Sequence, residues 1–115
     1  MRQMAFKVTA ETNNGIAKVT LAGELDASVA GDFRQAIEAV AAEKPKRLVL
    51  VLNDLTFIAS AGLRVLIFAK QKLGSAVDLY VIGAHDAVLE TLTMTGFHHS
   101  VILLDSYDAA EIENI

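Results

Sequence analysis

Leu48-Val49-Leu50-Val51-Leu52 is the stretch that decides the fold of this chain. It is a continuous apolar run between Lys46-Arg47 on one side and Asn53-Asp54 on the other. A strand with one face in water alternates between apolar and polar residues, whereas a strand that is apolar throughout is buried on both faces. The run therefore predicts a central strand of a largely parallel sheet, with helices packed on each side.

The residues before this run predict a hairpin followed by a helix. Residues 6–11 and 16–21 alternate between apolar and polar side chains, and Asn13-Asn14-Gly15 separates them, which is typical of two antiparallel strands. Gly23 is expected to end the second strand. Apolar residues at helical spacing then predict a helix that ends near Glu43, with Asp26 or Ser28 as its N-cap.

After the central run, helices and strands alternate. We expect a loop over 54–59, a helix that begins at about residue 60 and ends at Gly74, and a strand over 77–82. A helix over 85–94, a strand over 101–104 and a terminal helix capped by Asp105 or Ser106 complete the chain. This order predicts an α/β fold with one mixed, mostly parallel sheet layer, an N-terminal antiparallel hairpin at its edge and about four helices.

Composition limits the class of protein. The chain has 115 residues, of which 53% are hydrophobic, so we expect a single domain over residues 1–115. The absence of Cys excludes a thiol nucleophile and thiolate metal ligands, and the net charge of −4 argues against a nucleic-acid partner. The N-terminus lacks the apolar core of a signal peptide, and the longest apolar runs are far too short to span a membrane. We therefore expect a cytoplasmic protein without membrane insertion.

Function is expected at the carboxyl ends of the strands, where open α/β sheets place their binding crevices. Asp26 and Ser60 both follow strands that should end at the same edge of the sheet, so we expect them to share one surface. The segment after the central strand contains Ser60 beside three small residues, Ala59, Ala61 and Gly62, so the hydroxyl should be accessible. A phosphate on Ser60 would lie at the positive end of the following helix. The alternative is that Ser60 is only the N-cap of that helix.

Three segments resemble those of a known family. Ala22-Gly23-Glu24-Leu25-Asp26, Leu55-Thr56-Phe57-Ile58-Ala59-Ser60-Ala61-Gly62-Leu63 and Met94-Thr95-Gly96-Phe97 are similar to signatures of the STAS domain of bacterial anti-sigma factor antagonists. The order of the expected elements also agrees, and the resemblance extends over residues 6–108.

The resemblance implies a phosphorylated serine. In the family the loop has the order aromatic, aliphatic, Asp, Ser, Ser or Thr, Gly, Leu, and the anti-sigma factor, itself a Ser/Thr kinase, phosphorylates the first Ser. By position that residue is Ser60, while Ala59 replaces the usual Asp and Ala61 replaces the second hydroxyl residue. The implied partner-binding residues are Glu24, Asp26, Ala59, Ser60, Ala61, Gly62, Leu63 and Arg64.

The resemblance implies a binding regulator without catalytic residues, cofactor or metal. Such a protein binds the anti-sigma factor kinase and releases a sigma factor. Phosphorylation of Ser60 would add a charge of about −1.5 to −2 and end the binding, and a PPM-type protein phosphatase would reverse it. Ala59 and Ala61 favour an alternative, in which the chain is a STAS binding subunit without a switch in a larger signalling assembly or in lipid transport.

The enzyme and metal-site hypotheses have less support. Asp54 follows the central strand, as does the phosphoacceptor of response-regulator receivers, but the acidic cluster and the Lys that receivers need are missing. A hydrolase elbow needs Gly where Ile58 stands. His98, His99 and Asp105 would form a metal site only if adjacent histidines converged on one ion, and a solvated loop is the simpler interpretation.

Overall fold

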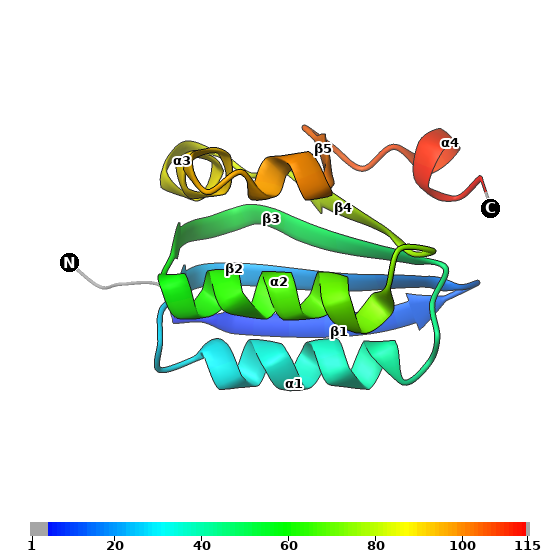
Figure 1. Cartoon of the computed structure of the whole chain (residues 1–115), viewed down its shortest axis with the longest axis horizontal. Coiled ribbons are helices and arrows are strands. Elements are labelled where there is room, and N and C mark those ends of the chain that lie inside the picture. Colours follow the sequence, from blue (N-terminus) through cyan, green and yellow to red (C-terminus); the bar gives the residue numbers. More distant parts are fainter. Residues whose placement is uncertain (1–4, 115) are drawn as a thin grey trace.

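One five-stranded sheet organises residues 5–114, the part of the chain that the computed structural model describes (Figure 1). The strands are β1 (Lys7–Asn13), β2 (Ile16–Leu25), β3 (Arg47–Ile58), β4 (Asp78–Ile82) and β5 (Ile102–Leu104). Their order in the sheet is their order in the chain; β1 and β2 are antiparallel, and every later pair is parallel. The predicted fold class is confirmed, with β3 at the centre.

The helices are α1 (Ala30–Ala41), α2 (Ser60–Leu73), α3 (Asp86–Met94) and α4 (Ala109–Ile112), with a short 3-10 helix, η1 (Phe97–Ser100). Glycines end two of them as predicted: Gly74 is the C-cap of α2, with φ +81°, and Gly96 follows α3, with φ +78°. None of the helices in the described residues is long and apolar enough to cross a membrane.

The main core lies between one face of the sheet and the helices α1, α2 and α3. Leu48, Leu50 and Leu52 point to this face, and each is fully buried. The apolar stripe of α1 packs there through Phe33 and Ile37. These residues have the helical spacing on which the predicted helix rests, so burial of the stripe fixes how α1 faces the sheet.

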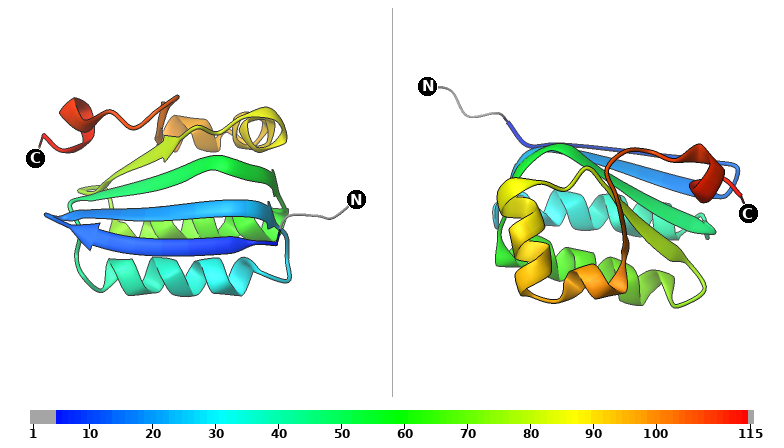
Figure 2. Two further views of the ribbon diagram at one scale, coloured as in Figure 1. Left: turned by 180° about the vertical axis from the view of Figure 1, so that it is seen from behind. Right: turned by 90° about the horizontal axis from the view of Figure 1, so that it is seen from above.

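On the other face of the sheet, the C-terminal segment is what covers β3 and β4 among the described residues. Ile112 of α4 is 0% exposed and packs with Val49, Tyr80 and Ile82. In Figure 2, no helix lies over this face of β1 and β2. The predicted cover on both faces of β3 is therefore confirmed for its first half, and a four-residue helix supplies the second cover.

Two strands are longer than the sequence predicted. β3 continues to Ile58, where a loop over 54–59 was expected, and β2 continues through Gly23 to Leu25. The strands pair along this extension with register shifts at Thr20/Ala22 and Gly23/Glu24. Gly23 has φ +90°, so it bends the strand at an irregularity and does not end it. In β2 the alternation of buried residues continues without a break to Leu25. In β3 the buried residues Leu52, Leu55 and Ile58 lie three positions apart, so no period of two marks the extension of that strand.

The expected N-caps of two helices were wrong. Val29 is the N-cap of α1, in place of Asp26 or Ser28, and no side chain caps it. Asp108 caps α4, in place of Asp105 or Ser106, by accepting a hydrogen bond from the Glu111 N–H at 3.2 Å. In both cases the helix begins later than expected because the chain first makes a turn.

Candidate functional site

The carboxyl ends of β2 and β3 bring the candidate residues together at one end of the sheet, on the left in Figure 1. Leu25 pairs with Ile58, and the Ala59 N–H donates to the Leu25 carbonyl at 2.8 Å. Asp26 and Ser60 follow directly after these residues. The prediction that they share one edge is therefore confirmed.

Ser60 is exposed and is the first residue of α2. The N-cap is Ala59, whose extended backbone has φ −82° and ψ 167°, and no side chain caps the helix. The alternative in which Ser60 serves as the N-cap is therefore wrong. The Leu63 N–H makes a helical bond to the Ala59 carbonyl at 3.0 Å, so the N–H groups of residues 60–62 have no partner inside the helix. An anion on Ser60 would meet these donors.

The position of Ala59 explains what the usual Asp of the family would do. A carboxylate at the N-cap accepts a hydrogen bond from the second or third N–H of the helix. Ala59 is half-buried and offers no acceptor. The first turn of α2 is therefore less constrained here than it would be with Asp.

Gly62 faces the interior. A Cβ built on it would lie 2.7 Å from Leu25 Cγ, 2.8 Å from Leu25 Cδ2 and 3.1 Å from Ile58 Cγ1. Gly62 therefore leaves no room for a partner, because the space is taken by Leu25. Gly62 allows α2 to approach the ends of β2 and β3 closely, and so it positions Ser60.

Asp26 holds the turn that leads into α1. Its Oδ1 accepts hydrogen bonds from the Ser28 N–H at 2.9 Å and from the Ser28 hydroxyl at 2.6 Å. The Ser28 hydroxyl is the main cause that lowers the pKa of Asp26, because these bonds favour the ionised carboxylate. Asp26 therefore presents a fixed negative charge beside Ser60.

Phe57 is a surface aromatic that the sequence analysis did not select. It is 42% exposed and pairs with Glu24 of β2 on the sheet face opposite the main core. The aromatic position of the family motif was the available signal. Large aromatics exposed beside polar groups are frequent anchors of protein interfaces, so Phe57 extends the candidate surface onto the open face of the sheet.

His85 is the N-cap of α3, next to the first residue of that helix, and it is partly exposed. Its Nε2 lies 2.8 Å from the Asn53 carbonyl, and its Nδ1 lies 3.0 Å from Asp86 Oδ2. The Asp86 carboxylate and the Asn53 carbonyl raise the pKa of His85, because both accept hydrogen bonds from the protonated ring. His85 thus links Asn53, within β3, to the start of α3.

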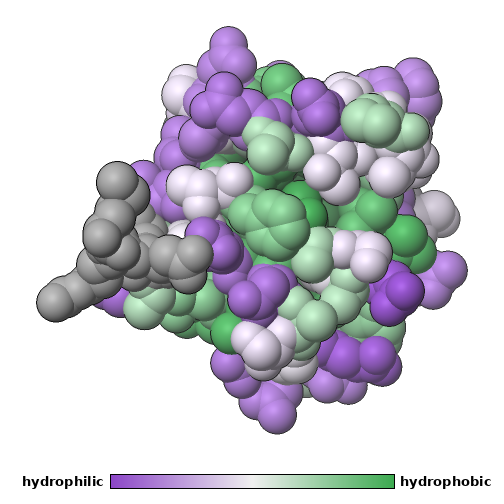
Figure 3. All heavy atoms as spheres, turned by 90° about the vertical axis from the view of Figure 1, so that its left-hand side faces the viewer, coloured by the Kyte–Doolittle hydropathy of each residue, from purple (hydrophilic) through white to green (hydrophobic). Residues whose placement is uncertain are grey.

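The surface at the end of the molecule that carries Ser60 is apolar at its centre. Figure 3 faces this end and shows hydrophobic side chains gathered in the middle, with hydrophilic ones around them. An apolar centre with a polar rim is the usual composition of a protein interaction surface. The end that carries Asp26 and Ser60 therefore has a composition that is typical of protein interaction surfaces.

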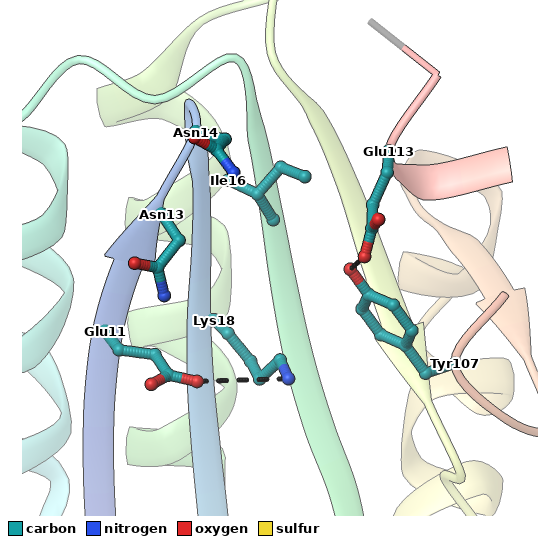
Figure 4. Close-up of a pocket in the computed structure, with 7 residues that line it drawn as sticks. All are labelled: Glu11, Asn13, Asn14, Ile16, Lys18, Tyr107 and Glu113. Atoms are coloured by element: carbon teal, nitrogen blue, oxygen red, sulfur yellow. Dashed lines mark hydrogen bonds and ion pairs between the residues drawn. The ribbon is translucent and has the colours of Figure 1, made fainter. Parts of the chain in front are cut away.

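A hollow of about 280 Å³ lies at the opposite end of the sheet from Ser60, between the hairpin and the C-terminal segment (Figure 4). The Tyr107 hydroxyl donates to Glu113 at 2.7 Å, and Lys18 Nζ lies 3.9 Å from Glu11. Burial, with help from Glu113, raises the pKa of Tyr107 to about 12, so the hydroxyl keeps its proton. The hollow contains no residue of the candidate site, and these polar groups already bind one another.

Residues of the weaker hypotheses lie apart from this site. Asp54 lies inside β3, next to Ala22, and His98 and His99 form part of η1 with their ring centroids 3.9 Å apart. Across residues 5–114, no three His, Asp or Glu side chains are grouped so that they would hold a metal ion.

Comparison with known proteins gives one family. The sequence model described as "STAS domain" matches residues 7–110. The chain is 30% identical over 92 residues to the anti-sigma-F factor antagonist RsfB of Mycobacterium tuberculosis, an alignment that covers 80% of this chain and 75% of RsfB. A crystal structure of an anti-sigma factor antagonist from Mycobacterium paratuberculosis is similar with a TM-score of 0.86 and 28% identity, over 96% of each chain.

The anti-sigma factor antagonist SpoIIAA in its unphosphorylated form shares the fold, with a TM-score of 0.72 and 16% identity over 95% of this chain and 96% of that one. The family match spans the hairpin, the central strand and the helix that begins at Ser60. The chain therefore belongs to the STAS domain family.

Proposed function

We propose that this protein is an anti-sigma factor antagonist that acts by binding and has no catalytic activity of its own. The names of the similar proteins support this function. The observation that carries it is the exposed Ser60, placed at the start of α2 on the same edge as the ionised Asp26. In this function the protein docks on a cytoplasmic anti-sigma factor, a Ser/Thr kinase, and displaces the sigma factor.

The docking face combines the ends of β2 and β3 with the first turns of α2. Glu24, Asp26, Phe57 and Ser60 are at least partly accessible there. Gly62 contributes indirectly, because its lack of a side chain sets the position of the helix. The remaining members of the face are Ala59, Ala61, Leu63 and Arg64.

Phosphorylation of Ser60 would end the docking. The kinase transfers the terminal phosphoryl group of ATP to Ser60 Oγ and releases ADP. The phosphate adds a charge of about −1.5 to −2 beside Asp26, and the free N–H groups of α2 stabilise it. Arg64, one turn further along α2, lies on the same side of the helix and can pair with it. A PPM-type phosphatase then hydrolyses the phosphoserine and restores binding.

A second candidate function is a STAS binding subunit that has lost its switch. The uncapped Ala59 favours it, because the first turn of α2 lacks the carboxylate that would orient Ser60 for a kinase. Such a subunit would bind its assembly regardless of the state of Ser60.

Two substitutions of Ser60 separate these functions. Ser60→Ala and Ser60→Asp both remove the hydroxyl, but only Asp adds charge, and the helix N-terminus tolerates that charge. Calorimetric titration against the anti-sigma factor kinase of the same genome should show near-normal affinity for Ser60→Ala. Ser60→Asp should bind at least about tenfold more weakly, equivalent to about 1.4 kcal/mol.

Thermal unfolding of both variants is the control, since weak binding counts only if the protein stays folded. Equal affinities, together with no phosphoserine in protein recovered from cells, would favour the subunit without a switch. If the unmodified protein does not bind the kinase at all, the antagonist function is wrong.

A further inference from the structure

A groove of about 240 Å³ runs between the first turns of α1 and α2, next to Ser60. α1 contributes Ala30, Gly31 and Arg34, and α2 contributes Ala61, Arg64 and Val65. Ala61 immediately follows Ser60 in α2, so the groove continues the docking face proposed above.

Both charged residues of the groove are arginines without an acidic partner. Within residues 5–114, no carboxylate oxygen lies within 4.0 Å of Arg34 or Arg64, whereas Arg47 lies 3.6 Å from Asp78. Both groove arginines are exposed. The chain as a whole carries a net charge of −4, so these two positive charges stand out on an acidic protein.

Arg34 is held in place across the groove. Its guanidinium carbon lies 4.1 Å from the centroid of the Phe68 ring, so the side chain of α1 reaches over α2. Stacking on an aromatic ring fixes the guanidinium and leaves its N–H edges free to bind a carboxylate. The side chain is therefore placed in advance for an anionic group.

The remaining lining suits a slender side chain. Ala30 and Val65 are buried and apolar, and a Cβ built on Gly31 would have no atom within 4 Å. Methylene groups can pack on this lining while a terminal carboxylate reaches the arginines.

We propose that this groove binds an acidic side chain, Asp or Glu, of the anti-sigma factor, with Arg34 and Arg64 binding its carboxylate. The inference rests on the proposed function, since it names a contact of that same partner. Glu24, near the end of β2, and Asp26, in the turn that follows, lie on the docking face proposed above and would be complemented by basic groups on the partner. A docking face with both signs of charge fixes the orientation of the partner, because a rotated complex would bring like charges together.

Neutralising each arginine tests the groove, with Lys72 as the matched control. Arg34→Gln, Arg64→Gln and Lys72→Gln each remove one positive charge, but Lys72 is exposed in the last turn of α2 and does not line the groove. Calorimetry with the anti-sigma factor of the same genome should show at least about tenfold weaker binding for each groove variant. Lys72→Gln should stay within about twofold, because rim charges contribute little to affinity.

Unfolding measurements and one further variant keep the test independent of folding. Arg34→Gln also removes the contact with Phe68, so thermal unfolding is measured for every variant, and Arg64→Gln gives the cleaner comparison. Ala61→Leu fills the groove without a change of charge and should weaken binding by a similar factor.

The outcomes separate this inference from the proposed function. If the unmodified protein binds and both groove variants equal Lys72→Gln, the groove is not the contact, although the antagonist function stands. If all three charge variants weaken binding equally, general electrostatic attraction explains the result and the inference is wrong. If the unmodified protein does not bind the anti-sigma factor, the proposed function and this inference both fail.

Discussion

Of the residues in the candidate site, Ala59 is the one at which a single substitution should have the largest stabilising effect. From the sequence, Ala59→Asp is expected to alter stability little, as for a substitution in an exposed loop. The structure changes that expectation, because Ala59 is the uncapped N-cap of α2. Asp there should raise the free energy of unfolding by about 1 kcal/mol, the usual contribution of an N-cap.

Chemical denaturation of Ala59→Asp beside Ala59→Asn checks this prediction. Asn also caps a helix but carries no charge, so a gain with both variants identifies capping as the cause. A loss of stability with both would show that the half-buried site has no room for a longer side chain. If Ala59→Asp also increases phosphorylation of Ser60 by the kinase, the natural alanine weakens the switch.

His85 should make stability depend on pH near neutrality. Both of its hydrogen-bond partners, the Asn53 carbonyl and the Asp86 carboxylate, are acceptors, and only the protonated ring can donate to both. The pKa of His85 in the folded state is therefore raised above its unfolded value of about 6.5. Its stabilising effect is full below pH 6.5 and is lost as the pH rises through the raised pKa.

Comparison with His85→Gln tests this sign. The stability advantage of the natural protein over the variant should be larger at pH 6 than at pH 9, measured by thermal unfolding. NMR titration of the natural protein should give the raised pKa directly. Asp86→Asn should bring it back toward the ordinary value, and Asn tolerates the φ of +49° at this position. An advantage that grows toward high pH would contradict the assignment.

At the scale of the elements, Gly62 determines how closely α2 approaches the ends of β2 and β3. Gly62→Ala should lower the free energy of unfolding by about 1–3 kcal/mol, because the added methyl group meets the buried Leu25. Gly31→Ala is the matched control, since Gly31 is also in the first turn of a helix and has open space at its Cβ. It should raise stability by about 0.5–1 kcal/mol.

Urea denaturation of the two variants gives the comparison. Both substitutions improve helix propensity, so the difference between them reports packing of the added methyl group against Leu25 and Ile58. If Gly62→Ala is as stable as Gly31→Ala, Leu25 can move aside, and the close approach does not depend on glycine.

At the scale of the whole molecule, the C-terminal segment supplies the cover for the second face of the sheet over β3 and β4. Ile112 is 0% exposed against Val49, Tyr80 and Ile82, although α4 is only four residues long. Ile112→Ala should lower the free energy of unfolding by about 2 kcal/mol or more, as for other buried aliphatic truncations. Ile67→Ala, at a site on α2 that is 41% exposed, should cost less than about 1 kcal/mol.

Denaturation curves and amide hydrogen exchange show whether the C-terminal segment unfolds together with the rest of the protein. A small effect of Ile112→Ala on global unfolding, with rapid exchange confined to residues 105–114, would show that the segment detaches on its own. The second face of the sheet would then be only loosely covered, and the main core beneath α1 and α2 would supply the stability.

The sequence by itself determined the order of the elements, the parallel sheet with its antiparallel hairpin, and the start of α2 at Ser60. These features depend on local patterns: the apolar run at Leu48–Leu52, the helical spacing of buried residues and the glycines that end helices. The sequence also predicted that Asp26 and Ser60 share an edge, because parallel strands end on the same side of a sheet.

Only the tertiary structure decided the length of β3, the N-caps and the role of Gly62. The extension of β3 depends on pairing with β2 across irregularities that no local period reveals. The role of Gly62 depends on its contact with Leu25, 37 positions earlier in the chain. The groove with Arg34 and Arg64 exists only because α1 packs beside α2. Contacts between residues distant in sequence leave no periodic signal in the chain, and for that reason the sequence predicted the elements but not how their side chains meet.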